Sequence, residues 1–239
     1  MSARFPSPPL RLRTLAIFGG TFDPVHCGHV AAACAARDRF KLDAVHFVVA
    51  GHPPHKQRAP LTPYLYRCAM VALACAGQPG LTASFAEAGT DFTGSRTFYS
   101  VDLVREYRKR LPRRAHLYFL IGADAFLEVG TWHEPERLLD SCDFLAVSRP
   151  GFRLDTLRRA LPPGVLLRNG SAAGTLRKQR EARMEMALRL RHSAVHLISS
   201  VHVDISSTEI RRRAAGGRSI RGLVPAAVED YICKQALYR

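Results

Sequence analysis

Short apolar runs alternate with helix-like segments along this chain, and that alternation constrains its fold more than any other feature. The runs predict strands at 15–18, 44–50, 116–121, 144–147 and 201–205. The segments that follow predict helices at 29–38, 64–76, 101–111, 207–214 and 225–237. Strands that alternate with helices pair in parallel, with helices covering both faces of the sheet. We therefore predict an α/β fold with a doubly wound parallel sheet and a small helical part at the C-terminal end.

Two of these segments also indicate how the sheet is covered. The run from 44 to 50 is apolar throughout, which is typical of a strand buried on both faces. In the helix at 64–76, an apolar stripe at helical spacing predicts the buried face. The stripe consists of Leu65, Cys68, Ala69, Ala72 and Cys75. Ligands of such sheets bind beyond the carboxyl ends of the strands, so the loops there are the place to look for a site.

The length of 239 residues suits one domain with an appended piece. Residues 1–13 carry three prolines between arginines, so we expect a flexible basic extension before a domain at 14–239. A basic insertion at about 158–195 interrupts the α/β pattern. We interpret its part from 177 to 191 as an exposed amphipathic helix, with a lid or a subunit contact as alternatives.

The composition is strongly basic, with a formal charge of +15 at pH 7. Such a balance suits nucleic-acid binding, but by itself it identifies no binding face. Only 5 of the 35 basic residues are Lys, and this excess of Arg is typical of proteins from GC-rich genomes. Positive charge also suits a site for phosphates. We therefore expect no dedicated nucleic-acid binding.

Targeting and cysteine patterns restrict the setting of the protein. No apolar run approaches the roughly 20 residues that cross a bilayer, and the first residues lack the apolar stretch of a signal peptide. The six cysteines include no CxxC pair, so neither a zinc site nor a disulfide framework is indicated. We expect a cytoplasmic protein with reduced thiols, no membrane association and no resident metal site.

The strongest chemical signal is the segment GGTFDPVHCGH at 19–29, directly after the first strand. Gly19 and Gly20 let the backbone turn sharply and let its N–H groups approach a phosphate. His26 and His29 share one face at the start of a helix, whose N-terminus adds partial positive charge. The pattern indicates a site for an anion whose charge grows during a reaction. Two solvated or core histidines are the alternative, and a metal pair is disfavoured because no further ligand stands at suitable spacing.

A second motif, ISSTEIRR, begins at Ile205. Ser206 and Glu209 have the spacing of a capping box, which by itself predicts only the start of a helix. With Ser207 and Thr208 the motif offers three hydroxyls at that helix N-terminus, and Arg211 lies one turn further on. Hydroxyl, backbone N–H and guanidinium donors in this arrangement can hold a polyphosphate.

Together these motifs resemble those of the nucleotidylyltransferase superfamily marked by an (H/T)xGH motif, and more narrowly bacterial nicotinate-mononucleotide adenylyltransferases. The resemblance covers about 15–238 apart from the basic insertion. It includes further segments in the family's order, namely PPHK at 53–56, YSVD at 99–102, IGAD at 121–124, TWH at 131–133 and RPG at 149–151. It implies a Rossmann-like fold and transfer of the adenylyl group of ATP to nicotinate mononucleotide, releasing pyrophosphate, in NAD biosynthesis.

The resemblance also implies a role for individual residues. The implied catalytic residues are His26, His29 and Arg211. The implied ATP-binding residues are Gly19, Gly20, Thr21, Phe22, His29, Gly122, Asp124, Ser206, Ser207, Thr208 and Arg211. The implied mononucleotide-binding residues are Lys56, Tyr99, Ser100, Trp132 and Arg149. Mg²⁺ is expected to arrive with ATP and to be held mostly through water, without a dedicated carboxylate cage.

Some features depart from the family pattern and leave alternatives open. Ser100 and Leu103 stand where the family has two Thr residues, and the region 162–200 is longer than expected. Phosphopantetheine adenylyltransferases are the nearest rival enzymes, although they usually have Thr at the position of His26. Cytidylyltransferases, and a regulator that binds nucleotides or nucleic acid without catalysis, are further alternatives. The sequence leaves the oligomeric state open, a homo-oligomer included.

Overall fold

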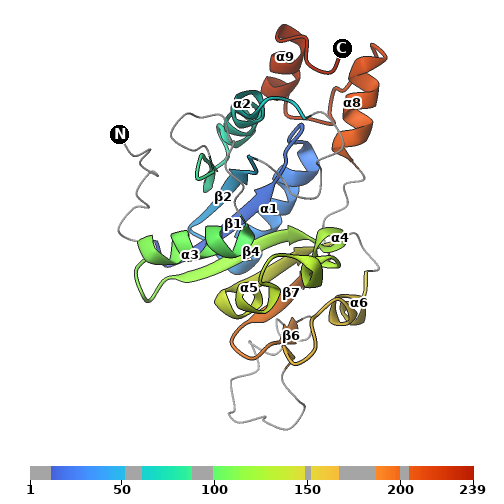
Figure 1. Ribbon diagram of the computed structural model, residues 1–239. Helices are drawn as coiled ribbons and strands as arrows, with labels where there is room; N and C mark the ends of the chain where they lie inside the picture. Colours follow the sequence, from blue (N-terminus) through green and yellow to red (C-terminus); the bar gives the residue numbers. More distant parts are fainter. Residues whose placement is uncertain (1–11, 52–60, 88–98, 149–151, 167–186, 200–204) are drawn as a thin grey trace.

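The computed structural model describes residues 12–51, 61–87, 99–148, 152–166, 187–199 and 205–239. Within this part of the chain, seven strands form one sheet in the order β3-β2-β1-β4-β5-β7-β6 (Figure 1). The strands are β1 (Thr14–Gly20), β2 (Ala44–Val49), β3 (Leu81–Ser84), β4 (His116–Gly122), β5 (Asp143–Val147), β6 (Ala187–Arg189) and β7 (Ala194–Ile198). Neighbouring strands run parallel except β6 and β7, which are antiparallel.

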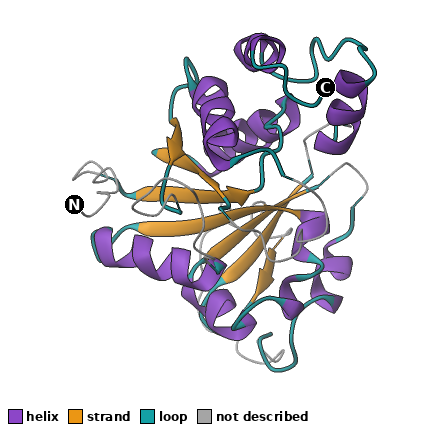
Figure 2. Cartoon of the chain, turned by 45° about the horizontal axis from the view of Figure 1, so that its top comes forward, coloured by secondary structure: helices purple, strands orange, loops and turns teal. Residues whose placement is uncertain are grey.

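Helices cover both faces of this sheet (Figure 2). One face is covered by α1 (Cys27–Phe40) and α2 (Tyr64–Cys75), and the same hydrophobic core continues to α8 (Ser207–Ala215) and to α9 (Ala226–Lys234), which packs on α2. The other packs against α3 (Ser100–Arg110), α4 (Ala123–Phe126), the 3-10 helix η2 (Val129–Thr131), α5 (Pro135–Ser141) and α6 (Leu154–Arg159). The doubly wound α/β fold is confirmed, and α8 and α9 form the expected helical part at the C-terminal end.

Each face of the sheet has its own hydrophobic core, because successive side chains of a strand point to opposite sides. In β1, Leu15 and Ile17 join the core under α3 and α5, whereas Ala16 and Phe18 join the core under α1 and α2. All six residues of β2 are buried, which confirms the strand predicted to be covered on both faces. The central strands therefore hold the loops at their carboxyl ends in fixed positions.

The sheet differs from the sequence prediction at both of its edges. Strand β3 was not predicted, because its four residues are too few to show a period. The strand predicted at 201–205 is wrong at Ile205, which lies outside any strand, while 201–204 lie outside the described residues. The strand that pairs with β5 is instead β7.

The helix predicted over 177–191 is also wrong where the structure describes it. Ala187–Arg189 form β6, and Leu190 continues the pairing through a bridge to Leu166. The apolar residues there fit a helical spacing over only a few positions, and a short apolar run does not distinguish helix from strand. Backbone pairing with β7 decided the outcome.

The buried face of α2 is rotated relative to the predicted stripe. Cys68 and Cys75 are buried as expected, but Leu65 and Ala72 are exposed. The buried face instead carries Arg67, which an apolar stripe cannot reveal. No helix in the described part of the chain has the length and apolarity needed to cross a membrane.

Candidate active site

A cavity of about 1220 Å³ opens beyond the carboxyl ends of β1, β4 and β5. This is the edge at which parallel α/β sheets bind ligands. Residues from four predicted segments line it together: Gly19, Gly20, Thr21, Phe22, His26, His29, Tyr99, Ser100, Gly122, Asp124 and Trp132. The fold therefore brings most of the predicted site residues to one cavity, although their individual roles stay predictions.

Lys56 and Arg149 lie outside the described residues, so the structure does not place them. The residues assigned to the second phosphate motif, Ser206, Ser207, Thr208 and Arg211, are not among the described lining residues. Ile205, directly before them, does line the cavity. The second motif thus begins at the rim of the cavity and continues away from it.

The two histidines of the first motif lie face to face at the N-terminus of α1. Helix α1 begins at Cys27, two residues earlier than predicted, and His26 is its N-cap. The ring centroids of His26 and His29 are 3.6 Å apart at an interplanar angle of 27°. The backbone N–H of His26 donates to Nδ1 of His29 over 3.2 Å. A neutral His29 therefore carries its proton on Nε2.

Burial changes the charge that this pair offers. His26 is buried, and desolvation lowers its pKa to about 4. At neutral pH its imidazole is therefore uncharged and can donate one hydrogen bond. A fixed neutral donor at His26, together with the positive end of the α1 dipole, suits an oxyanion whose charge increases during reaction.

The aromatic ring of Phe22 packs against His29, one of the two stacked histidines. Phe22 has a φ of 50°, in the left-handed region, and its ring is buried against Phe18, Phe47 and His29. A Cβ at Gly20 would lie 2.8 Å from Cζ of Phe22. Gly20 is therefore required by the packing of Phe22 and not only by the approach of a phosphate. The Phe22 side chain supports His29, which the sequence-based assignment to ATP binding did not anticipate.

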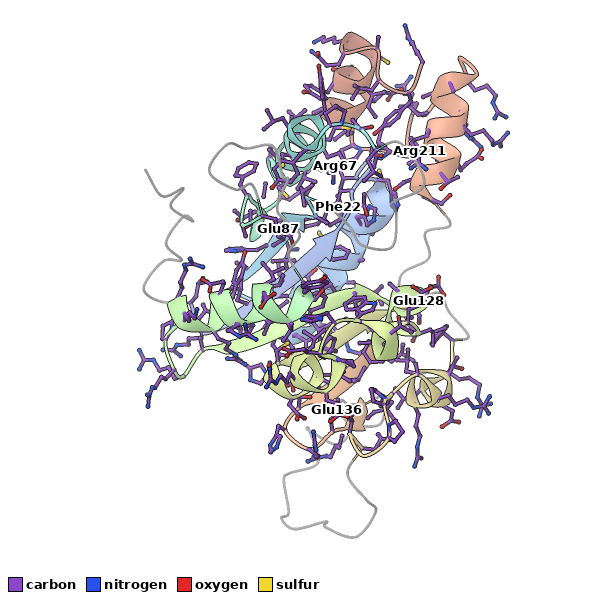
Figure 3. All side chains as sticks on the ribbon, in the orientation of Figure 1. Phe22, Arg67, Glu87, Glu128, Glu136 and Arg211 are labelled. Carbon is purple, nitrogen blue, oxygen red and sulfur yellow. The ribbon has the colours of Figure 1, made fainter. Side chains whose placement is uncertain are left out.

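Arg67 ties the first motif to the rest of the sheet. Its side chain is 2% exposed and donates to four carbonyl groups, those of Thr21, Ala50, Gly51 and Thr62, over 2.7–3.2 Å. One guanidinium thus joins the turn after β1 to the loop after β2 (Figure 3). In the sequence, Arg67 lies within the helix predicted at 64–76, and its buried location gives no local signal.

The second motif is bound directly to the first. Ser206 caps α8 by accepting from the N–H of Glu209 over 3.2 Å, as the capping-box spacing predicts. The hydroxyl of Ser207 donates to the carbonyl of Pro24 over 2.9 Å. Arg211 Nη1 donates to the carbonyl of Asp23 over 2.7 Å. Because Ser207 uses its hydroxyl proton within the protein, a phosphate at this helix would be met mainly by backbone N–H groups and the remaining donors of Arg211.

Aromatic side chains dominate the other end of the cavity. The rings of Tyr99 and His133 lie 4.1 Å apart at 31°, and Tyr99 is 37% exposed. Trp132 is half-buried and packs edge-on against Phe119, with the ring centroids 6.4 Å apart. Ser100 is the first residue of α3. His133 belonged to a motif segment but had been given no role.

Glu87 is a buried acid of the cavity that the sequence analysis did not identify. Its carboxylate accepts from the N–H of Gly51 over 3.0 Å. Burial raises the pKa of Glu87 to about 7, although the Gly51 hydrogen bond and the charge of Arg67 oppose this shift. Among the described residues, no three His, Cys, Asp or Glu side chains are grouped so as to hold a metal ion.

Solved structures with the same architecture include two of a Plasmodium falciparum nicotinic acid mononucleotide adenylyltransferase. The structure complexed with NaAD matches 95% of this chain and 97% of that chain with a TM-score of 0.67. The structure complexed with APC matches equally large shares with a TM-score of 0.65. Both are 18% identical in sequence, so they establish the likeness of fold alone.

Sequence comparison identifies the family of this chain, which the likeness of fold alone does not. The cytidylyltransferase-like family model matches residues 17–213. A probable nicotinate-nucleotide adenylyltransferase of Moorella thermoacetica is 40% identical over 93% of this chain and 90% of its own length. The protein of the same description from Geobacter metallireducens is 41% identical over 93% and 96%. The chain therefore belongs to the cytidylyltransferase-like family and, within it, to the nicotinate-nucleotide adenylyltransferases.

Proposed function

We propose that this chain transfers the adenylyl group of ATP to nicotinate mononucleotide, forming nicotinate adenine dinucleotide and pyrophosphate in NAD biosynthesis. Relatives that are about 40% identical to this chain over at least 90% of their own length bear the name of this activity. The observation in this chain that carries the proposal is the stacked His26–His29 pair, which faces the same cavity as an aromatic wall around Trp132. A phosphate-handling end and an aromatic end in one cavity suit a reaction that joins two nucleotides.

The reaction needs positioning more than it needs a base. An oxygen of the mononucleotide phosphate attacks the α-phosphorus of ATP, the bond from that phosphorus to the bridging oxygen breaks, and pyrophosphate leaves with the electron pair. The attacking oxygen is already anionic, so no proton has to be removed from it. The protein contributes alignment and donors for the charge that develops on the equatorial and leaving oxygens.

We assign His26 and His29 to those developing charges, because both line the cavity at the N-terminus of α1. The backbone of the turn from Gly19 to Phe22 and the strand end at Gly122 are assigned to ATP, together with the α8 N-terminus and Arg211. Trp132, Tyr99 and Ser100 are assigned to the mononucleotide at the opposite end. Lys56 and Arg149 complete the proposed mononucleotide contacts on the strength of the sequence motifs alone.

We propose that Mg²⁺ enters bound to ATP, held by phosphate oxygens and water, since Mg²⁺ keeps much of its water shell in sites of this kind. Asp124 is an exposed carboxylate on the cavity wall and could meet that shell. The ion would neutralise charge on the departing pyrophosphate. ATP and a mononucleotide as substrates also support the expectation of a cytoplasmic protein.

The test is pyrophosphate release from Mg²⁺-ATP with nicotinate mononucleotide, nicotinamide mononucleotide and phosphopantetheine compared side by side. We expect the nicotinate form to lead the nicotinamide form at least about tenfold in kcat/KM, because an amide facing donors leaves an unpaired contact worth about 1–3 kcal/mol. Release with phosphopantetheine alone would overturn the proposal. Equal efficiency with both pyridine nucleotides would leave the reaction standing but remove the proposed preference.

A further inference from the structure

Three distant segments of the chain meet at Asp23, in the turn that precedes the histidine pair. Asp23 is 3% exposed. Its Oδ1 accepts from the hydroxyl of Tyr238 over 2.7 Å, and its Oδ2 accepts from the N–H of Thr62 over 3.2 Å. Its carbonyl accepts from Arg211 over 2.7 Å. Asp23 therefore joins the segment before α2, helix α8 and the segment after α9 to the first motif.

Tyr238 contacts Asp23 although the two residues are 215 positions apart in the sequence. After α9, Ala236 and Tyr238 have φ values of 50° and 68°, so the backbone turns back in the left-handed region. The N–H of Leu237 returns to the carbonyl of Ile232 over 3.1 Å. Burial raises the pKa of the Tyr238 hydroxyl, so it stays protonated and donates.

Further contacts connect the same C-terminal part to the first motif. The N–H of Cys27, the first residue of α1, donates to the carbonyl of Leu223 over 2.9 Å. Ser207 holds the carbonyl of Pro24, as described above. The turn from Asp23 to Cys27 is therefore fixed against α8 and against the segment between α8 and α9, and His26 lies inside this turn.

We propose that Tyr238 is a positioning residue for the adenylyl transfer. Its hydroxyl holds the Asp23 carboxylate, and the Asp23 carbonyl in turn orients Arg211 relative to His26. Tyr238 does not line the described cavity, so it acts through these residues and not on substrate. The inference rests on the proposed function, because it names what aligns the residues assigned there to ATP.

The first test replaces Tyr238 with Phe, which keeps the ring and removes the hydroxyl. We expect kcat to fall about tenfold, since small displacements of catalytic groups cost up to about a hundredfold. The KM for nicotinate mononucleotide should stay within about twofold, because Trp132 and Tyr99 lie at the other end of the cavity. The matched control is Tyr231→Phe, which removes a hydroxyl from α9, where Tyr231 packs against Tyr66. This control should retain the wild-type kcat.

A double-mutant cycle with Asp23→Ala then separates positioning from general stabilisation. If Tyr238 acts through Asp23, Tyr238→Phe should lower kcat less than about twofold when Asp23→Ala is already present, because interacting residues are not additive. A full tenfold loss on top of Asp23→Ala would overturn the inference. So would an unchanged kcat in the single variant, or an equal loss in Tyr231→Phe.

A binding measurement keeps this inference distinct from the proposed reaction. If the wild-type protein releases no pyrophosphate with any acceptor, the proposed function fails. The positioning inference is then decided by calorimetric titration with a non-hydrolysable ATP analogue, which Tyr238→Phe should weaken at least about threefold and Tyr231→Phe should not. Equal affinity of all three proteins would overturn it.

Discussion

The two ends of the cavity are built by different means. At the end near the histidine pair, buried polar side chains are held by hydrogen bonds, as Arg67 at 2% exposure with its four carbonyl partners and Asp23 illustrate. At the other end, Tyr99 is 37% exposed, and the side chains meet mainly through ring faces and edges. One end is a fixed polar framework and the other is an aromatic surface.

This difference follows from what each end has to do. Hydrogen-bond donors stabilise a transition state only if they already point to the right place, so the phosphate end benefits from buried groups with a single geometry. An aromatic ring is recognised by stacking, which tolerates small displacements and depends less on direction. Substitutions at the histidine end should therefore change stability or kcat, and those at the aromatic end should change KM.

The largest expected effect is on stability, at Arg67. Replacing Arg67 with Met leaves four carbonyl groups, one buried and three half-buried, without their donor, and we expect a loss of at least about 4 kcal/mol in the free energy of unfolding. The same change at Arg105, an exposed ion-pair residue of α3, should cost less than about 1 kcal/mol. Urea denaturation of both variants measures the contrast. Similar losses of stability in the two variants would show that the carbonyl contacts of the buried Arg67 contribute no more than an exposed ion pair.

Next in size is the loss of a donor at the reaction centre. We expect His29→Ala to remain folded and to lower kcat by about 10²–10³, equivalent to about 3–4 kcal/mol in the barrier. His133→Ala, at the aromatic end, should mainly raise the KM for the mononucleotide. Steady-state kinetics with each substrate varied in turn distinguishes the two. Near-normal kcat in His29→Ala would reduce His29 to a structural residue.

The buried framework should also make stability depend on pH through Glu87. Its pKa is raised from 4.5 to about 7, so its contribution to stability is complete below pH 4.5 and is lost as the pH rises through 7. The loss is about 3 kcal/mol, from about 1.4 kcal/mol per pKa unit. Glu87→Gln should abolish this slope in denaturation curves from pH 4.5 to 8, whereas Glu128→Gln, an exposed carboxyl on the opposite half of the molecule (Figure 3), should retain it.

A smaller effect is expected from the packing of Phe22. A methyl group at position 20 would meet the Phe22 ring, and we expect Gly20→Ala to destabilise the protein by about 1–3 kcal/mol. Gly122 also ends a strand at the cavity, but nothing lies within 4 Å of a Cβ built there. Thermal unfolding of Gly122→Ala should therefore show a smaller loss than Gly20→Ala. The reverse order would contradict the steric explanation.

The smallest expected effect is in binding at the aromatic end. Stacking of a ring on an aromatic side chain contributes about 1–3 kcal/mol, so Trp132→Ala should raise the KM for nicotinate mononucleotide about tenfold. The KM for ATP should not change, and Trp132→Phe should recover most of the loss. If Trp132→Ala raised the KM for ATP as much as the KM for nicotinate mononucleotide, Trp132 would serve packing against Phe119 and not recognition of the mononucleotide.

The sequence by itself determined the features that are local along the chain. The glycines and the histidine spacing act within the junction between β1 and α1, and the capping-box serine acts at the start of α8. The structure has both helix starts close to where the motifs predicted them. The alternation of apolar runs with helical segments likewise determined the α/β class. Even the departures at the sheet edges concern short segments, where periodicity carries little information.

The tertiary structure decided which polar residues became buried and what each of them holds. Arg67 lies 46 residues from the Thr21 carbonyl it binds, and Tyr238 lies 215 residues from Asp23. No local sequence pattern predicts such contacts. A buried polar group is tolerated only where the fold supplies its partner, and here the partner is distant in the sequence. The same holds for Glu87, whose pKa depends on burial. Most of the residues that line the cavity could therefore be predicted from the sequence, whereas the framework that holds them arises from contacts made only on folding.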